Sequence, residues 1–237
     1  LEAIGLRPIS ILVDITNLAT FDLGRPLHVF DADKLKGNLD VRYARNGETL
    51  QALNEKEYSL TSDMVVIADQ AAAQSIGGIM GGELTGCEND TVNVFVECAL
   101  FDPIVTAKTG RKLQINSDAR YRFERGVDPQ SVIWGIEVAT RLITELCGGE
   151  ASHVVRAGEV PAPKNSFDLR IDRIAELGGV AVEQDRAAEI LTALGFEVTA
   201  KEGVLGTIAP TWRPDIVGEA DLVEEVLRIV GYDQIPT

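Results

Sequence analysis

Two polar side chains stand in apolar surroundings where they could bind a ligand or assist a reaction. His28 follows a Gly-Arg-Pro turn and lies between apolar neighbours, and Glu97 interrupts the apolar run from Val94 to Ala99. Strand alternation would place Glu97 on the same face as Phe95. A histidine can exchange a proton near neutral pH, and a carboxylate that lines a pocket can select a polar group on a ligand. Each has a plainer alternative: a hydrogen-bonded structural histidine, and a glutamate on a solvated face.

A glycine-rich segment lies between these two residues. It reads Ile-Gly-Gly-Ile-Met-Gly-Gly-Glu over residues 76–83, and its paired glycines would let the backbone approach a ligand closely. The spacing does not match the helix-opening glycines of a dinucleotide or P-loop motif. We therefore expect tight turns or the wall of a shaped pocket, and no phosphate-binding loop.

These residues need a sheet to position them, and the first part of the chain predicts one. Strand-like runs recur at residues 39–44, 64–68 and 92–98, whereas helices are scarcer. The best helix is expected to begin at Asp128 as N-cap with Pro129 in its first position, and to end at Gly148-Gly149. We predict an α+β (mixed α/β) domain with a sheet-rich core over residues 1–158.

Two prolines close together predict a linker at residues 159–165, followed by a second domain over residues 166–237. The second domain should contain a helix at residues 171–177 and another that is capped by Asp185 and stops at Gly195. Strands at residues 197–200 and 205–209 and a helix at residues 219–230 follow. This order is typical of a small winged-helix-like α+β domain.

Composition limits the possible functions. The 237 residues are 45% hydrophobic and 25% charged, which is typical of a globular protein. No apolar run could span a bilayer and no secretion signal opens the chain, so we expect no membrane partner and a cytoplasmic location. The three cysteines are far apart and should be reduced thiols. The chain begins with Leu1 and ends with Ile-Pro-Thr, and we expect it to be a piece of a longer protein.

The net charge of -15 argues against binding to nucleic acid through the general surface, because an acidic surface repels phosphates. One segment departs from this average. Six basic residues lie between Lys108 and Arg125. They could form a local basic strip, or a solvated face with internal salt links.

Four sequence strings together carry a family resemblance. Gly-Arg-Pro-Leu-His-Val-Phe-Asp, Gly-Gly-Ile-Met-Gly-Gly-Glu, Arg-Phe-Glu-Arg-Gly-Val-Asp-Pro and Ala-Pro-Thr-Trp-Arg-Pro-Asp, the last with the helix near residues 219–232, resemble the beta chain of bacterial phenylalanine–tRNA ligases. They occur in the family's order and cover nearly the whole chain. The resemblance implies that residues 1–158 are the third and fourth modules of that chain, and that the second domain is its fifth.

The resemblance implies an editing site that hydrolyses tyrosine from mischarged tRNA(Phe). A pocket for phenylalanine cannot strongly reject an analogue that only adds a hydroxyl, so a second site must do so. Matched by motif, Glu97 would select the hydroxyl, and Asn17, His28, Ser117 and Ala119 would line the pocket. The backbone of Gly77, Gly78 and Gly81 would form a wall. An activated ester needs a positioned water and no full triad, so His28 and Ser117 are expected to position water or substrate.

The sequence departs from the family at two of these positions. The family often has threonine where Ser117 stands and histidine where Tyr121 stands. Serine keeps the hydroxyl, whereas the absence of histidine argues against an essential role at residue 121.

In the second domain, the resemblance implies a magnesium site formed by four carboxylates: Asp215, Asp221, Glu224 and Glu225. Three of them share one side of the last helix, where acidic residues could equally complement the helix dipole. The family also implies an alpha subunit as partner, an alpha2 beta2 tetramer, and ATP binding only in the whole enzyme. Two alternatives remain: a non-catalytic docking module of the synthetase, and a stand-alone aminoacyl-tRNA deacylase.

Overall fold

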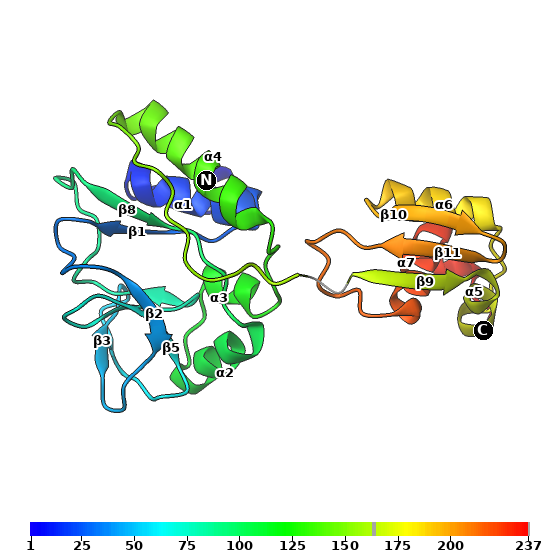
Figure 1. Cartoon of the computed structure of the whole chain (residues 1–237), viewed down its shortest axis with the longest axis horizontal. Coiled ribbons are helices and arrows are strands. Elements are labelled where there is room, and N and C mark those ends of the chain that lie inside the picture. The colour runs from blue at the N-terminus through cyan, green and yellow to red at the C-terminus, as the bar shows by residue number, and fades with distance from the viewer. Residues whose placement is uncertain (163–164, 237) are drawn as a thin grey trace. The chain divides into compact units, whose positions relative to one another are not determined.

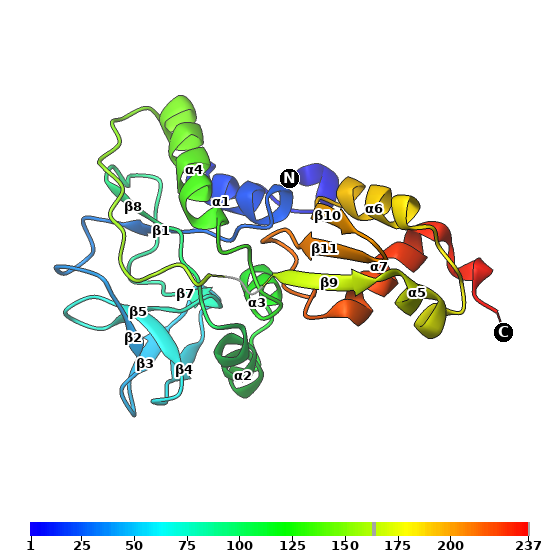
Figure 2. The same cartoon turned by 45° about the vertical axis from the view of Figure 1, so that its right-hand side comes forward.

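The computed structural model describes residues 1–162 and 165–236 and divides the chain into two compact units, Leu1–Val160 and Pro161–Thr237. Figures 1 and 2 show the elements of each unit. Pro163 and Lys164, which belong to the predicted linker, lie outside the described residues. Helices and antiparallel sheets occur in both units, which confirms the predicted α+β class.

The first unit combines four α-helices with three small antiparallel sheets in its described part. Strands β1 and β8 form a two-stranded ladder, β2-β5-β6-β7 form a four-stranded sheet, and β3 pairs with β4. The elements are η1 (Glu2–Ile4), α1 (Ile11–Asp22), β1 (His28–Asp31), β2 (Asp40–Tyr43), β3 (Thr49–Gln51), β4 (Glu57–Ser59), β5 (Val65–Ala68), β6 (Ala73–Ile76), β7 (Met80–Gly81), β8 (Val94–Glu97), α2 (Pro103–Leu113), α3 (Asp118–Phe123) and α4 (Ser131–Cys147).

The expectation that helices are scarce in this unit was wrong. Helices α1, α2 and α3 each begin at a capping side chain, because Ser10, Asp102 and Ser117 each accept a hydrogen bond from the backbone N–H three residues on. The missed helices are short or carry a weakly patterned apolar face. Their caps were the local signal that sequence reasoning overlooked.

Helix α4 begins two residues later than predicted. Gln130 is its N-cap residue, and Ser131 opens the helix. The carboxylate of Asp128 accepts from the N–H of Gln130, and its carbonyl accepts from the N–H of Ser131. Asp128 therefore caps a turn before the helix. The helix ends at Gly148 as predicted, in a left-handed φ of 78°.

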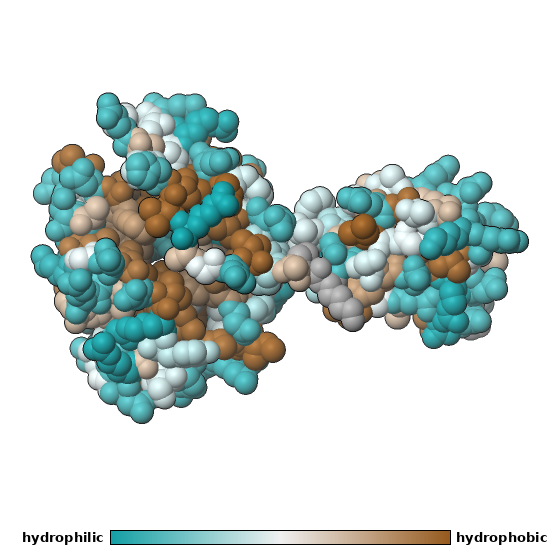
Figure 3. Space-filling model, viewed as in Figure 1, coloured by the Kyte–Doolittle hydropathy of each residue, from teal (hydrophilic) through white to brown (hydrophobic). Residues whose placement is uncertain are grey.

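Two apolar clusters stabilise the first unit. One lies in the four-stranded sheet and includes Leu60, Met64, Val66 and Ile76. The other joins α1, α4 and the β1–β8 ladder. On the visible face, hydrophobic side chains gather across the middle of the unit, between that ladder and the sheet with β2 and β5 (Figure 3).

The second unit packs three helices on a three-stranded antiparallel sheet in the order β10-β11-β9. Its elements are β9 (Ser166–Arg170), α5 (Ile171–Gly178), α6 (Gln184–Ala193), β10 (Glu197–Lys201), β11 (Val204–Ile208), α7 (Glu219–Val230) and η2 (Tyr232–Gln234). Strand β9 was not predicted, and the N-cap residue of α6 is Glu183, with Asp185 inside the first turn. The predicted bounds of α7 are confirmed.

Over the described ranges, every helix is too short or too polar to cross a lipid bilayer.

Candidate functional site

The β1–β8 ladder brings His28 and Glu97 directly opposite each other. They are register partners at one end of the antiparallel pair. The alternation predicted for β8 is confirmed: Val96 packs against the α1–α4 cluster, whereas Glu97 lines a cavity on the other face. Because residues directly opposite on antiparallel strands have their side chains about 5 Å apart, the two groups can act on one ligand.

The cavity has a volume of about 70 Å³ and mixed walls. Aromatic and aliphatic side chains form most of its surface, glycine backbone forms one wall, and His28, Ser75 and Glu97 supply polar groups. Its lining residues are Pro26, Leu27, His28, Ser75, Gly78, Ile79, Met80, Gly81, Glu97, Phe101, Ala119 and Phe123. Its few convergent polar groups among apolar walls resemble a small-ligand site, although it is smaller than the about 300 to 1,000 Å³ that such sites usually have.

The ring of His28 is held with one nitrogen unpaired. It packs edge-on against Phe30, with ring centroids 4.4 Å apart, and Nε2 is buried without a hydrogen-bond partner among the described residues. Burial lowers the pKa of His28 to about 4, so the ring is neutral at pH 7. A buried polar atom without a partner is costly, and a water or ligand in the cavity would satisfy it.

Glycine backbone makes room for this ring and for a neighbouring aromatic. A Cβ at Gly81 would lie 2.8 Å from His28 Nε2, which is too close for van der Waals contact. Gly78 adopts a left-handed φ of 69°, and a Cβ there would lie 2.8 Å from Cδ2 of Phe101. Gly77 lies against Phe101 in the same way but is not among the lining residues.

The carboxyl group of Glu97 is poised between its two protonation states. Burial raises its pKa to about 7, and the charge of Arg25 and the backbone N–H of Ala99 partly oppose that rise. Phe101 and Phe123 stand on the cavity wall with ring centroids 5.1 Å apart. The apolar wall accounts for the preference for the uncharged acid, and a shifted pKa in a cavity marks Glu97 as a candidate functional group.

Helix α3 supplies another wall of the cavity. Ala119 lines it, whereas Ser117 lies beside it with its hydroxyl already committed. Ser117 Oγ donates to the carbonyl of Ile79 at 2.6 Å and accepts from the N–H of Arg120 at 3.1 Å. Ser117 thus ties α3 to the glycine-rich turn. Its predicted contact with the substrate stays a prediction.

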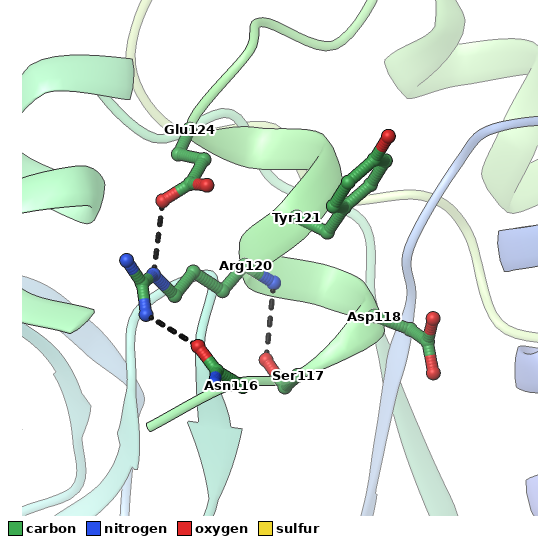
Figure 4. A pocket seen from close by; sticks show the side chains of 6 residues that line it. All are labelled: Asn116, Ser117, Asp118, Arg120, Tyr121 and Glu124. Atoms are coloured by element: carbon green, nitrogen blue, oxygen red, sulfur yellow. Dashed lines mark hydrogen bonds and ion pairs between the residues drawn. The ribbon is translucent and has the colours of Figure 1, made fainter. Parts of the chain in front are cut away.

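An open groove of about 330 Å³ lies along α3, and Ser117 is one of its lining residues (Figure 4). Arg120 crosses it and binds Glu124 at 2.9 Å and Asn116 at 3.0 Å, while Tyr121 and Asp118 point away from that pair. This groove shares α3 with the cavity, but its polar groups largely satisfy one another.

The basic strip of residues 108–125 is largely paired. Four of its six cations form ion pairs with carboxylates, in the pairs Lys112–Asp63, Arg120–Glu124, Arg122–Asp118 and Arg125–Glu124. The internal salt links of the second alternative are therefore present in this segment.

Of the predicted site residues, the structure brings His28, Gly78, Gly81, Glu97 and Ala119 together in the cavity. Asn17 lies partly buried in α1 and is not among the lining residues. Sequence reasoning did not single out the aromatic walls Phe101 and Phe123. It also found no role for Arg25 beyond the Gly-Arg-Pro turn, although this side chain is completely buried next to the cavity.

In the described residues, the four carboxylates of the second unit all have partners within the chain. Asp215 and Glu225 share the guanidinium of Arg213, with contacts of 2.6 and 2.8 Å, and Glu225 is also bound by Arg228 at 2.6 Å. Among the described residues, no group of three or more acidic, histidine or cysteine side chains could hold a metal ion. Arginine already supplies the positive charge that a cation would bring.

The other two carboxylates have separate roles. Asp221 accepts from the backbone N–H groups of Val217 and Gly218, both at 2.9 Å, and so caps α7, while Glu224 accepts from the hydroxyl of Tyr232 at 3.3 Å. The present arrangement does not fit magnesium, and the predicted site remains an implication of the family resemblance alone.

Comparison with known proteins gives two domain families. The B3/4 domain matches residues 1–148, and the tRNA synthetase B5 domain matches residues 167–232. Among curated relatives, the phenylalanine–tRNA ligase beta subunits of Paramagnetospirillum magneticum, Rhodospirillum rubrum and Ruegeria pomeroyi are 58%, 56% and 55% identical. Each match covers 99% or 100% of this chain and 29% or 30% of the relative, so the chain spans about 30% of their length.

A solved N-terminal fragment of the phenylalanyl-tRNA synthetase beta subunit from Pyrococcus horikoshii is more distant. Its sequence is 20% identical, the match covers 93% of this chain and 65% of that fragment, and the TM-score is 0.43.

Proposed function

Because the chain belongs to the family of phenylalanine–tRNA ligase beta subunits, with a B3/4 domain followed by a B5 domain, we propose that its first unit edits tRNA(Phe) by hydrolysing mischarged tyrosine. The observation that carries this proposal is the pair His28 and Glu97, which face one small cavity with largely apolar walls. The tyrosyl side chain enters the cavity, and the ester is cleaved at its mouth.

Glu97 selects the substrate in this proposal. Its carboxyl accepts a hydrogen bond from the phenolic hydroxyl of tyrosine, whereas the ring of phenylalanine would leave it desolvated and unpaired. A hydrogen bond to a charged group contributes about 1.5 to 3 kcal/mol, which corresponds to about 10- to 150-fold in discrimination. The surrounding aromatic side chains favour either ring equally and so cannot make this choice.

His28 positions the reacting groups. Its ring is neutral at pH 7, and its buried Nε2 has no partner in the described part of the chain, so it can hydrogen-bond a water or the substrate in the cavity. An aminoacyl ester is already activated, and a well-placed water is the main requirement for its hydrolysis. Ser117 contributes through α3, whose position its two hydrogen bonds fix.

The proposed partners are inferred from the names of the related proteins, because the cavity itself does not identify them. We propose that the chain works with the alpha subunit of the same ligase, in an alpha2 beta2 assembly in the cytoplasm, and on tRNA(Phe) carrying tyrosine. The names of the relatives as beta subunits support a partner subunit. ATP-dependent attachment of phenylalanine belongs to the whole enzyme in this proposal.

The test is hydrolysis of tyrosyl-tRNA(Phe) beside phenylalanyl-tRNA(Phe) by the chain and by its Glu97→Ala and His28→Ala variants. We expect selective release of tyrosine, a discrimination about 10- to 150-fold lower in Glu97→Ala, and slow hydrolysis of both esters in His28→Ala. Equal release of both amino acids by the unmodified chain would contradict the proposal. So would unchanged discrimination in Glu97→Ala.

A further inference from the structure

The guanidinium of Arg25 is completely buried beside the cavity. Arg25 lies in the turn between α1 and β1 and precedes Pro26, which lines the cavity. It donates to three uncharged acceptors: Cys98 Sγ at 3.1 Å, Ser131 Oγ at 3.3 Å, and the backbone carbonyl of Ala99. Across residues 1–162 and 165–236, it forms no ion pair with a carboxylate.

A buried arginine of this kind needs an explanation. Arginine stays charged under all ordinary conditions, and a buried charge without an opposite charge is costly. Neutral acceptors offset only part of that cost, and a well-packed apolar side chain would usually stabilise the same site better. The charge therefore points to a role outside simple packing.

The contacts of Arg25 converge on the end of β8 that carries Glu97. Two of its three acceptors belong to Cys98 and Ala99, the residues that follow Glu97. The N–H of Ala99 in turn favours the carboxylate of Glu97. Gly135 of α4 lets the arginine chain pass, because a Cβ there would lie 3.0 Å from its Cγ. Arg25 thus acts on Glu97 through its charge, and it also binds the carbonyl of Ala99, the residue whose N–H favours the Glu97 carboxylate.

We propose that Arg25 is a positioning residue of the cavity: its buried guanidinium fixes the end of β8 and favours the charged form of the Glu97 side chain over the neutral acid. The consequence for tyrosine selection rests on the proposed editing function. The link between Arg25 and Glu97 does not.

The other groups that face Glu97 cannot replace this charge. His28 on β1 is buried and neutral at pH 7, and burial raises the pKa of the Cys98 thiol, so that it stays protonated. The cavity walls from the other elements are uncharged, namely Leu27, Ser75, Ile79, Met80, Phe101, Ala119 and Phe123 together with the glycines. In the described part of the chain, Arg25 is the cation that favours the Glu97 carboxylate.

The charged form of Glu97 would discriminate more strongly than the neutral acid. A carboxylate makes a shorter and stronger hydrogen bond to a phenol, and it is also the costlier group to leave beside an unsubstituted ring. Losing the Arg25 charge should therefore weaken the preference for tyrosine at pH 7 and move the pH at which it develops upward.

The test is the pKa of Glu97, measured by carbon-13 NMR on the glutamate-labelled chain, with Glu97→Gln to assign the signal. We expect Arg25→Met and Arg25→Gln to raise this pKa by about 1 to 3 pH units, the usual effect of losing a nearby opposite charge. Arg25→Lys should restore most of the difference. Ser131→Ala is the matched control, because it removes one hydrogen bond of Arg25 and keeps the charge.

An unchanged Glu97 pKa in folded Arg25→Met or Arg25→Gln would overturn the proposal, as would an equal shift in Ser131→Ala. If neither charge-removing variant folds, the unmodified chain decides: a Glu97 that is ionised in a large fraction at pH 7 supports the proposal, and one that stays protonated well above pH 7 overturns it. The NMR measurement needs no tRNA. A chain that hydrolyses no ester but shows the expected shift would reject the editing function and retain the Arg25–Glu97 link.

Discussion

Replacing Gly81 by alanine should block the cavity while leaving the backbone undisturbed. The added Cβ would lie 2.8 Å from His28 Nε2 and would overlap Cε1, whereas carbon and nitrogen atoms pack comfortably at about 3.5 to 4.0 Å. The His28 ring would have to move by about 1 Å. It is held edge-on against Phe30, so it cannot turn away without losing that contact. Gly81 has no left-handed φ, so backbone strain does not contribute.

Two effects of different size should follow from Gly81→Ala. Overpacking of this kind costs about 1 to 3 kcal/mol of stability, and each kcal/mol lowers Tm by about 2 to 4 °C in a chain of this length. A displacement of about 1 Å in a group that positions the reaction can cost about 100-fold in rate. We therefore expect a modest loss of Tm and a drop of about 100-fold in kcat/KM for hydrolysis of tyrosyl-tRNA(Phe).

The assay compares Gly81→Ala with Gly206→Ala, another glycine in a strand. A Cβ at Gly206 would lie 3.5 Å from Asp168 Oδ1, an ordinary contact, so this control should keep both Tm and activity. If Gly81→Ala hydrolysed the ester at the unmodified rate, His28 would either be mobile or have no part in the reaction, and the reasoning would fail.

Three further predictions concern stability. Folding raises the pKa of Glu97 from about 4.5 to about 7, so stability is lost as the pH rises through this range and the buried group ionises. Glu97→Gln should therefore raise Tm at pH 8 and leave Tm nearly unchanged at pH 4. An equal change of Tm at both pH values would contradict this prediction. Gly178→Ala should cost about 1 to 3 kcal/mol in urea unfolding, because its Cβ would overlap Leu227 of α7, whereas Gly206→Ala, which meets only ordinary contacts, should cost little. Glu225→Gln should lower the free energy of unfolding, because it leaves Arg213 and Arg228 without their shared carboxylate. Breaking a fully buried ion pair costs about 3 to 5 kcal/mol, and we expect a somewhat smaller loss here. A loss within error of zero would show that water already solvates the two arginines.

Sequence patterns predicted those parts of the fold that depend on local chemistry. The bounds of α7, the stop of α4 at Gly148 and the alternation that turns Glu97 away from Val96 all follow from periodicity and glycine. Asp128 shows the limit of such patterns. It has the sequence of an N-cap followed by proline, yet it caps a turn two residues before the true N-cap residue, Gln130. Several local arrangements satisfy the same donors, and tertiary packing selects among them.

The candidate site shows a second limit. Glycine motifs and family strings identified the residues with unusual backbone or chemistry, but not the aromatic side chains that enclose them. Phe101 and Phe123 are ordinary apolar residues in sequence, and only the close approach of Phe101 to Gly78 reveals their part in the cavity. The four carboxylates of the B5 domain show the reverse case. Their spacing is suggestive, but Arg213 stands between two of them.

His28 and Glu97 lie opposite each other, and burial shifts their pKa values in opposite directions, to about 4 and about 7. Burial disfavours the charged form of both groups, so near pH 7 the histidine is neutral and only the glutamate changes charge. In the proposed editing function, the cavity would then offer a neutral nitrogen to the reacting ester and a variable charge to the amino-acid side chain. The net charge of -15 repels phosphates, so in this proposal the cavity would select the amino acid and most of the affinity for tRNA would come from elsewhere.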